Sequence, residues 1–412
     1  MKIAVLSKAD ARGGGASRIA SELVDQLLAA GQETVHWTAR QYGPSAHPLR
    51  PLYGDIPTVN FAVRAGHSLL RALGVPEGLA VEQINPDLVD LLDCDVIHVH
   101  DISNALAVDT LAWLARFRPL VWTLHDCSPF TGGCLYPMAC LRFRARCGHC
   151  PGRGIWPLVG LFDGTPWILA QKRRFARQTR FVALAPSRWM ADMAENRGFF
   201  PRPIVVSNGI DLGTFRPVPK DDARRRLGLP SGRLVLAVCS GDLFDTRKGI
   251  RQALAVARCA HVRAPLVLAI GTPSPAIVAE FPDIDIHFTG FINDRNMLAV
   301  YYAAADLLLY CSYADNQPLT VMEAMACGTP VVGFAAGGIP ELVDHLENGF
   351  LSLADDGRIL RAEIEGIIGS ADRLRAWSMA AAHKAARLFG WERCVSAHLH
   401  LYESLVEGGK SH

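Results

Sequence analysis

The chain has 412 residues, of which 50% are hydrophobic and 20% are charged, and its formal net charge is +2. This length exceeds what one hydrophobic core usually supports, so the sequence predicts two domains. The composition excludes a largely disordered protein, and the near-neutral charge gives no support for nucleic acid as a partner. We find no apolar stretch of the roughly 20 residues that span a bilayer and no secretory cleavage site near the N-terminus, so we expect a cytoplasmic protein.

Short β-rich apolar runs alternate with segments of helical length in both halves of the chain. The first half contains KIAVLS, DVIHVH, LVWTLH and FVALAPS, and the second contains RLVLAVCS, PLVLAIG, IDIHFTG, DLLLYCS and TPVVGF. Continuous apolar strands separated by helices are typical of parallel sheets that are covered on both faces. The sequence therefore predicts an α/β fold with two Rossmann-like, doubly wound domains that face each other across a cleft.

A stretch rich in proline and turn-forming residues, 201–219, interrupts this alternation and is typical of an interdomain linker. We expect an N-terminal domain over 1–203, with a Cys-rich insertion at 127–151, and a C-terminal domain over 204–390. The last segment, 391–412, has apolar residues at helical spacing and predicts a terminal helix that packs back toward the N-terminal domain. Such folds bind ligands where the carboxyl ends of the strands converge.

A run of three glycines, Gly13, Gly14 and Gly15, follows the first predicted strand and opens an amphipathic helix. Glycines at this place allow backbone amides at a helix N-terminus to approach an anion such as a phosphate. The GxGxxG spacing of dinucleotide-binding proteins is absent, so a tight turn without a ligand is the competing interpretation.

Two cations, Arg247 and Lys248, follow the strand RLVLAVCS and precede another helix. Cations at the carboxyl end of a strand suit a diphosphate leaving group, because its charge grows as the bond breaks. A solvated turn is the alternative.

The strongest functional signal is a pair of carboxylates, Asp315 and Glu323. Asp315 lies in the predicted loop DNQPLT, and Glu323 lies in the helix after it. Both can accept hydrogen bonds from sugar hydroxyls, and the amides at Leu319 and Thr320 can bind a phosphate. The segments ACGTPVV and GGIPELV follow this pair.

Together with SNGID, RKG, TGF and YYAAADLLLYCS, which stand in the expected order, this segment resembles the retaining glycosyltransferases of family 4, which have the GT-B fold. The resemblance covers nearly the whole chain and is densest in the second half. It implies transfer of a hexose-type sugar from a UDP- or GDP-sugar to a glycan or lipid-linked acceptor in polysaccharide biosynthesis. It also implies that catalysis requires no cofactor and no divalent metal.

The resemblance further implies roles for individual residues. Lys248 would neutralise the diphosphate, Glu323 would hold the nucleotide ribose, and Asp315 would contact the transferred sugar. His125, at the end of LVWTLH, would lie beside the sugar and the acceptor. The other donor-binding positions that it implies are Gly14, Gly15, Arg247, Phe291, Asn316, Gln317, Pro318, Leu319 and Thr320. His98 and His100, which end a neighbouring strand, are interpreted as structural.

Two positions depart from the family pattern. Asp242 stands where the family usually has Arg, and Asp315 stands where it usually has Glu. The alternative function is therefore a non-catalytic partner subunit that binds sugar or nucleotide without turnover. The missing GxGxxG disfavours an NAD-dependent dehydrogenase, and a nucleotide-sugar epimerase is a more distant alternative.

Four cysteines of the insertion, Cys134, Cys140, Cys147 and Cys150, have the spacing C-x5-C-x6-C-x2-C. Four clustered thiolates with a CxxC end suit a tetrahedral structural zinc. Reduced or redox-linked thiols are the alternative, and an iron–sulfur cluster is less favoured. A similar insertion occurs in a subset of the family that is often of the exopolysaccharide type.

A basic stretch follows the insertion. Between Arg142 and Arg180 nine side chains are basic and one is acidic, and aromatic residues are interleaved. This composition predicts peripheral contact with an anionic membrane, and a solvated helix face is the alternative.

Overall fold

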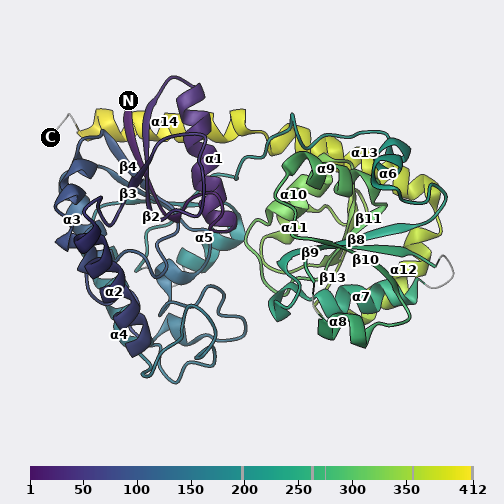
Figure 1. Ribbon diagram of the computed structural model, residues 1–412, viewed down its shortest axis with the longest axis horizontal. Helices are drawn as coiled ribbons and strands as arrows, with labels where there is room; N and C mark the ends of the chain where they lie inside the picture. Colours follow the sequence, from purple (N-terminus) through teal and green to yellow (C-terminus); the bar gives the residue numbers. More distant parts are fainter. Residues whose placement is uncertain (196–198, 261–263, 274, 355–356, 410–412) are drawn as a thin grey trace. The chain divides into compact units, whose positions relative to one another are not determined.

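The computed structural model describes residues 1–195, 199–260, 264–273, 275–354 and 357–409. It forms two compact units: Met1–Gly209 together with the segment that begins at Cys394, and Ile210–Arg393. Each unit contains one parallel β-sheet with helices packed beside it (Figure 1). The prediction of two parallel-sheet α/β domains is confirmed.

The sheet of the first unit has the order β3-β2-β1-β4-β5-β6-β7, and every pairing is parallel. Its strands are β1 (Lys2–Ala9), β2 (Glu33–Arg40), β3 (Leu49–Pro51), β4 (Val96–Val99), β5 (Leu120–Thr123), β6 (Val182–Ala185) and β7 (Ile204–Val205). Its helices are α1 (Gly15–Ala29), α2 (Pro57–Leu73), α3 (Val108–Leu114), α4 (Thr165–Gln178), α5 (Arg188–Glu195) and α14 (Trp391–Gly409), with short 3₁₀ helices at Val81–Ile84, Pro86–Leu92, Ser128–Phe130 and Arg142–Arg144. The strand β7 falls within the stretch 201–219 and pairs with β6.

The sheet of the second unit has the order β10-β9-β8-β11-β12-β13 and is also entirely parallel. Its strands are β8 (Val235–Asp242), β9 (Leu266–Thr272), β10 (Asp285–Gly290), β11 (Leu307–Tyr310), β12 (Val331–Phe334) and β13 (Gly349–Ser352). Its helices are α6 (Lys220–Leu227), α7 (Ile250–Cys259), α8 (Pro275–Glu280), α9 (Arg295–Ala304), α10 (Leu319–Ala326), α11 (Ile339–Leu342), α12 (Arg358–Ile368) and α13 (Ala371–Leu388), with a 3₁₀ helix at Thr246–Lys248.

The central strands are buried along their whole length because helices cover both of their faces. Every residue of β4, β5, β11 and β12 is buried. Continuous burial of this kind is what distinguishes an inner parallel strand from a strand with one solvated face. Among the helices of the described residues, none is both long enough and apolar enough to cross a membrane.

Helix α14 follows the second unit in the sequence but belongs to the first unit. The hydroxyl of Tyr402, which is fully buried, is hydrogen-bonded to Nδ1 of His98 in β4 at 2.6 Å. This bond joins residues that are 304 positions apart. Residues 410–412, the end of the predicted terminal helix, lie outside the described residues.

Candidate functional site

The loops that follow β8 and β11 bring two cations and a carboxylate together in the second unit. β8 ends at Asp242, and the 3₁₀ helix Thr246–Lys248 follows before α7 begins. β11 ends at Tyr310, and Asp315 lies between β11 and α10. These two strands are paired neighbours at the point where the strand order reverses. In open parallel sheets, ligands bind at this point, outside the carboxyl ends of the strands.

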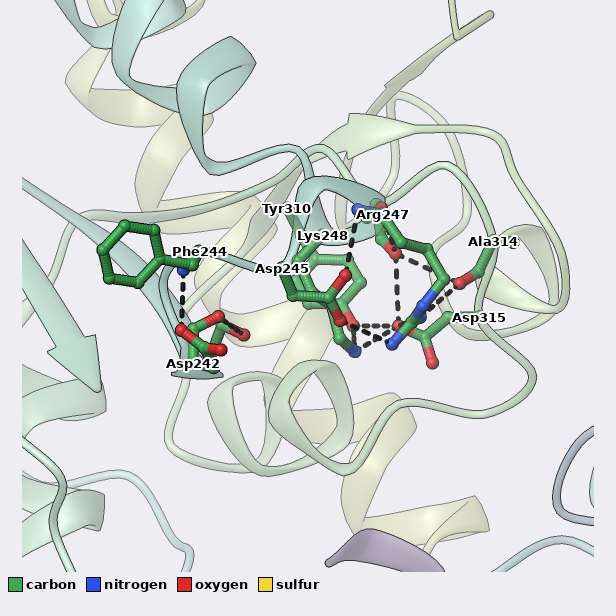
Figure 2. A network of polar contacts seen from close by, with 10 residues as sticks. Asp242, Phe244, Asp245, Arg247, Lys248, Tyr310, Ala314 and Asp315 are labelled. Atoms are coloured by element: carbon green, nitrogen blue, oxygen red, sulfur yellow. Dashed lines mark hydrogen bonds and ion pairs between the residues drawn. The ribbon is translucent and has the colours of Figure 1, made fainter. Parts of the chain in front are cut away.

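Asp315 is the centre of this cluster (Figure 2). Its Oδ2 accepts hydrogen bonds from Nζ of Lys248 at 2.6 Å and from the hydroxyl of Tyr310 at 2.5 Å. Arg247 is more distant, with its Nη1 3.6 Å from the same oxygen, and the same nitrogen donates to the carbonyl oxygen of Ala314 at 2.7 Å. The two predicted cations therefore both face the predicted sugar-binding carboxylate.

The charges of the cluster stabilise one another. Burial alone would raise the pKa of Asp315, but the neighbouring Lys248 and Arg247 outweigh burial and hold the pKa of this carboxyl below its usual value. Arg247 also forms an ion pair with Asp245 at 3.0 Å. Asp315 is therefore ionised at neutral pH, and Lys248 is held at a fixed position as a cation.

Two glycines allow the loops of the cluster to approach each other closely. Gly249 has a φ of 63°, and a Cβ at this position would lie 2.0 Å from the carbonyl oxygen of Cys311. Gly337 has a φ of 62°, and a Cβ there would lie 1.9 Å from the carbonyl oxygen of Asp315. A side chain at either position would displace the backbone, so these glycines of RKG and GGI hold the loops in place.

The other predicted donor-binding residues lie mostly on the same loop and on α10. Glu323 is 1% exposed on α10, and Phe291, which follows β10, is 61% exposed. Of the predicted residues between Asp315 and Glu323, Asn316 and Pro318 are buried, and Gln317, Leu319 and Thr320 are half-buried. Pro318 is the N-cap of α10 and makes no side-chain cap.

The sequence does not single out Tyr310 as a site residue. Tyr310 ends the apolar strand LLLY, and a tyrosine in such a strand is typically a core residue. Its hydroxyl nevertheless reaches Asp315, since the strand ends there. The one signal in the sequence is a tyrosine at the carboxyl end of a strand, where the side chain can carry a polar tip into a ligand site. Asp242 lies apart from this cluster and accepts a hydrogen bond from the backbone N–H of Phe244 at 2.8 Å (Figure 2).

Histidines form a second polar cluster, in the first unit. His98 lies in β4, His100 follows this strand, and His125 follows β5. Nδ1 of His100 is 2.8 Å from Nε2 of His125, and the two rings are stacked. Besides Tyr402, His98 has a second partner in Oγ1 of Thr123, at 2.7 Å. The rings of His98 and His100 are 4.2 Å apart, so the cluster is continuous from α14 to His125.

The hydrogen bond between His100 and His125 has one favoured direction. Within the described structure, Nε2 of His100 is buried and has no hydrogen-bond partner. If His125 were the donor, neutral His100 would bury an unpaired N–H, at a cost of about 1–3 kcal/mol. We therefore assign the proton to Nδ1 of His100, which donates to Nε2 of His125. Burial lowers the pKa of His100 and lowers that of His125 to about 4, so both rings are neutral at pH 7.

The glycine turn lies at the carboxyl end of β1, the strand beside β4. Gly14 has a φ of 104°, and α1 begins at Gly15 without a side-chain cap. Apart from their chain neighbours, no described residue has a heavy atom within 4 Å of a Cβ placed on either glycine, whereas a Cβ on Gly13 would lie 2.3 Å from that of Ala9. The backbone of Gly14 and Gly15 therefore has space beside it for a ligand.

The four cysteines of the insertion, Cys134, Cys140, Cys147 and Cys150, line one small cavity and are all free thiols. This cavity is formed by the segment between β5 and α4. Its lining includes no residue of the donor cluster or of the histidine cluster.

Comparison with known proteins identifies the family. Residues 13–214 match the family model described as Glycosyltransferase Family 4, and residues 235–369 match the model described as Glycosyl transferases group 1. A D-inositol 3-phosphate glycosyltransferase of Catenulispora acidiphila is 33% identical over 77% of this chain and 74% of its own length. The enzyme of the same name from Thermobispora bispora is 32% identical, and the match spans 50% of this chain and 51% of that relative.

Solved structures agree with this assignment at the level of the fold. Sucrose-phosphate synthase from Thermosynechococcus elongatus has a TM-score of 0.72 at 21% identity, with 99% of both chains covered. Anabaena HepE in complex with UDP has a TM-score of 0.69 at 18% identity, with 98% of this chain and 100% of that chain covered. The chain therefore belongs to the family 4 glycosyltransferases and has their GT-B fold.

Proposed function

We propose that this chain is a retaining glycosyltransferase that moves a hexose from a UDP- or GDP-sugar to a glycan or lipid-linked acceptor in polysaccharide biosynthesis, of the exopolysaccharide type. The observation that carries this proposal is the position of Lys248. Its ammonium is held by Asp315 and Tyr310 at the carboxyl edge of the second sheet, where a ligand of a parallel sheet binds.

The donor site is proposed to extend from this cluster along α10. Because Pro318 supplies no side-chain cap, the amides of the first turn of α10 are suited to bind a phosphate. The exposed ring of Phe291 offers a face on which the nucleotide base can stack. Glu323 would bind the ribose. The complex of HepE with UDP supports a uridine nucleotide as the first candidate.

In the proposed reaction, Lys248 and the amides of α10 stabilise the charge that grows on the diphosphate as the sugar leaves. The acceptor hydroxyl attacks from the face that the diphosphate vacates, and the diphosphate oxygen takes its proton, so the configuration of the sugar is retained. His125 is neutral at pH 7 because its pKa is lowered to about 4. Its role is therefore to orient hydroxyls by hydrogen bonding, and Gly14 and Gly15 offer amides on the acceptor side.

We propose that this reaction needs no divalent metal, since Lys248, Arg247 and the amides of α10 supply the positive charge. Transfer measured in the presence of EDTA should match transfer in added Mg²⁺ or Mn²⁺. A rate that depends on either ion would contradict this part of the proposal.

The membrane contact is also proposed, on the basis of a groove in the first unit. Arginines surround this groove, which has a volume of about 720 Å³ and includes Arg146, Arg173, Arg174, Arg177 and the ring of Trp167. Arginine and tryptophan side chains together suit an interface with anionic lipid. Vesicles that contain phosphatidylglycerol should co-sediment with the protein at low salt, and vesicles of phosphatidylcholine should not.

The first experiment measures nucleotide binding by calorimetry with UDP, GDP and ADP. One nucleotide should bind the wild-type protein, and Lys248→Met should weaken this binding at least tenfold. Lys220→Met is the matched control, because Lys220 forms an ion pair of the same length with Asp306 at the opposite end of β11. If no nucleotide binds, or if both variants bind equally well, the assignment of the donor site is wrong.

The alternative is a partner subunit that binds without turnover, which the departures at Asp242 and Asp315 favour. The two functions are separated by incubating the protein with the sugar conjugate of the nucleotide that binds. Release of the free nucleotide, with an inositol phosphate and a lipid-linked sugar among the acceptors, supports the enzyme. Binding without release under all of these conditions supports the partner subunit.

A further inference from the structure

The segment between β5 and α4 has little regular structure to hold it. All residues from 124 to 164 are described, and they contain two short 3₁₀ helices, Ser128–Phe130 and Arg142–Arg144. Its cysteines are free, so no disulfide closes it. A segment of this length without secondary structure of its own requires another source of order.

The four cysteines of this segment surround a single small cavity. Cys134, Cys140, Cys147 and Cys150 all line it, and its volume is about 20 Å³. This is close to the smallest volume that holds one water molecule, so the cavity has room for one small ion and little else. The segment thus gathers four sulfur-bearing side chains, from positions spread over 17 residues, around a space for a single ion.

Two backbone groups are arranged to stabilise negative charge on the sulfurs. The N–H of Gly132 donates to the sulfur of Cys147, and the N–H of Gly152 donates to that of Cys150. A Cβ on Gly132 would lie 3.0 Å from Sγ of Cys147, so only glycine permits this approach without a shift. Hydrogen bonds from amides to sulfur stabilise a thiolate more than a thiol, and thiolates are the form in which cysteine binds metals.

We propose that Cys134, Cys140, Cys147 and Cys150 bind one zinc ion that orders the segment between β5 and α4. Zinc suits this set because thiolates are soft ligands and four of them match its tetrahedral preference. Binding converts four thiols and Zn²⁺ into a tetrathiolate complex with a charge of −2 and releases four protons, with no change of oxidation state. Arg142 lies at the same cavity, where its guanidinium donates to the carbonyl oxygens of Gly148 and His149.

The sulfurs do not yet stand at ligand positions. Across the described residues, no three His, Cys, Asp or Glu side chains are already set out to hold a metal. Binding therefore requires the four side chains to turn toward the centre of the cavity that they line. Gly148 and His149, which separate Cys147 from Cys150, have φ values of 129° and 47°, and the chain bends at His149.

The test is the metal content of the purified full-length protein, measured by mass spectrometry after dialysis. We expect one zinc per chain in the wild type and at least a fivefold loss in Cys147→Ser and Cys150→Ser. Cys259→Ser, outside the segment and half-buried on α7, is the matched control and should keep its zinc. Nucleotide binding is measured in parallel, so that failure of this proposal is distinguished from failure of the donor site.

A second measurement keeps the proposal testable if the serine variants do not fold. The wild type is stripped of metal under reducing conditions and titrated with Co²⁺, which should give the sulfur-to-cobalt charge-transfer absorption of a tetrathiolate site. Zinc should then displace the cobalt. A wild-type protein that contains no zinc and binds neither ion would overturn the proposal, as would iron with inorganic sulfide or a disulfide among the four cysteines.

Discussion

The two units have the same strand order around their centres but differ in the groups that they place at the carboxyl edge. In the first unit the ends of β1 and β4 carry glycines, an ion pair between Lys8 and Asp101, and the histidine His100, which burial keeps neutral. In the second unit the loops after β8 and β11 carry Lys248 and Asp315, which stabilise each other as ions. The topology therefore fixes where a ligand can bind in each unit. The loop residues decide which kind of ligand binds there.

The largest effect that would test this contrast is the loss of the second unit's cation. Lys248→Met should lower kcat/KM at least about 100-fold, or about 2.7 kcal/mol, because the developing charge on the diphosphate loses its partner. Nucleotide release from the sugar donor measures the effect. The kcat/KM of Lys220→Met should remain within twofold of the wild-type value. Equal losses in both variants would show that a cation at the carboxyl edge matters no more than a cation elsewhere in the second unit.

The second effect concerns the stability of the second unit. Asp315→Asn should lower the free energy of unfolding by about 2 kcal/mol at pH 7, since the carboxylate accepts charged and neutral hydrogen bonds while buried. The pKa of Asp315 is lowered by folding, so this contribution is present above the unfolded value of 3.8 and is lost as the pH falls through the folded value. Urea unfolding at several pH values measures it. Asp285→Asn, in an exposed ion pair, should change stability by less than about 0.5 kcal/mol.

The first unit should respond to acid earlier. Burial lowers the pKa values of His98 and His100 and lowers those of His125 and His398 to about 4, so the unfolded chain binds more protons below pH 6.5. Stability should fall as the pH drops from 6.5 to about 4, because the unfolded chain takes up protons that the buried rings exclude. Asp126, whose pKa is raised to about 6 by burial, offsets part of this loss.

Hydrogen exchange with labelling times corrected for pH can locate this loss. Peptides of the first unit should lose protection from amide hydrogen exchange between pH 6.5 and 5, and peptides of the second unit should keep their protection. Simultaneous loss in both units would mean that the histidine cluster does not set the acid response.

The smallest effect is on the orientation of His125. His100→Phe should lower kcat/KM about tenfold by removing the donor to Nε2 of His125, and His100→Asn, whose amide can occupy the place of Nδ1–H, should restore most of the rate. The pH profile of each variant separates loss of orientation from loss of folding. Equal rates in both variants would show that the hydrogen bond does not position His125.

The sequence predicts the fold well, because parallel strands that are buried on both faces leave continuous apolar runs such as LVWT and LLLY. It also predicts that Arg247, Lys248 and Asp315 follow strands, since their positions relative to the apolar runs are local. These predictions depend on neighbours in the chain, which a sequence displays directly.

The contacts of the site are harder to predict, because they join distant segments. The sequence places Tyr310 in the core, and only the end of β11 shows that its hydroxyl meets Asp315. The direction of Arg247 depends on the carbonyl of Ala314, and the pairing of His100 with His125 depends on the register of β4 and β5. Spacing alone contains none of this information.

The hydrogen bond between Tyr402 and His98 has a consequence for the order in which the protein matures. The first unit is built from two separate stretches of the sequence, and the stretch that begins at Cys394 is synthesised after the whole second unit. Until Tyr402 has been synthesised, the earlier part of the first unit leaves exposed the surface that α14 covers, and His98 lacks this hydrogen bond. A product truncated before Tyr402 would therefore lack a complete histidine cluster.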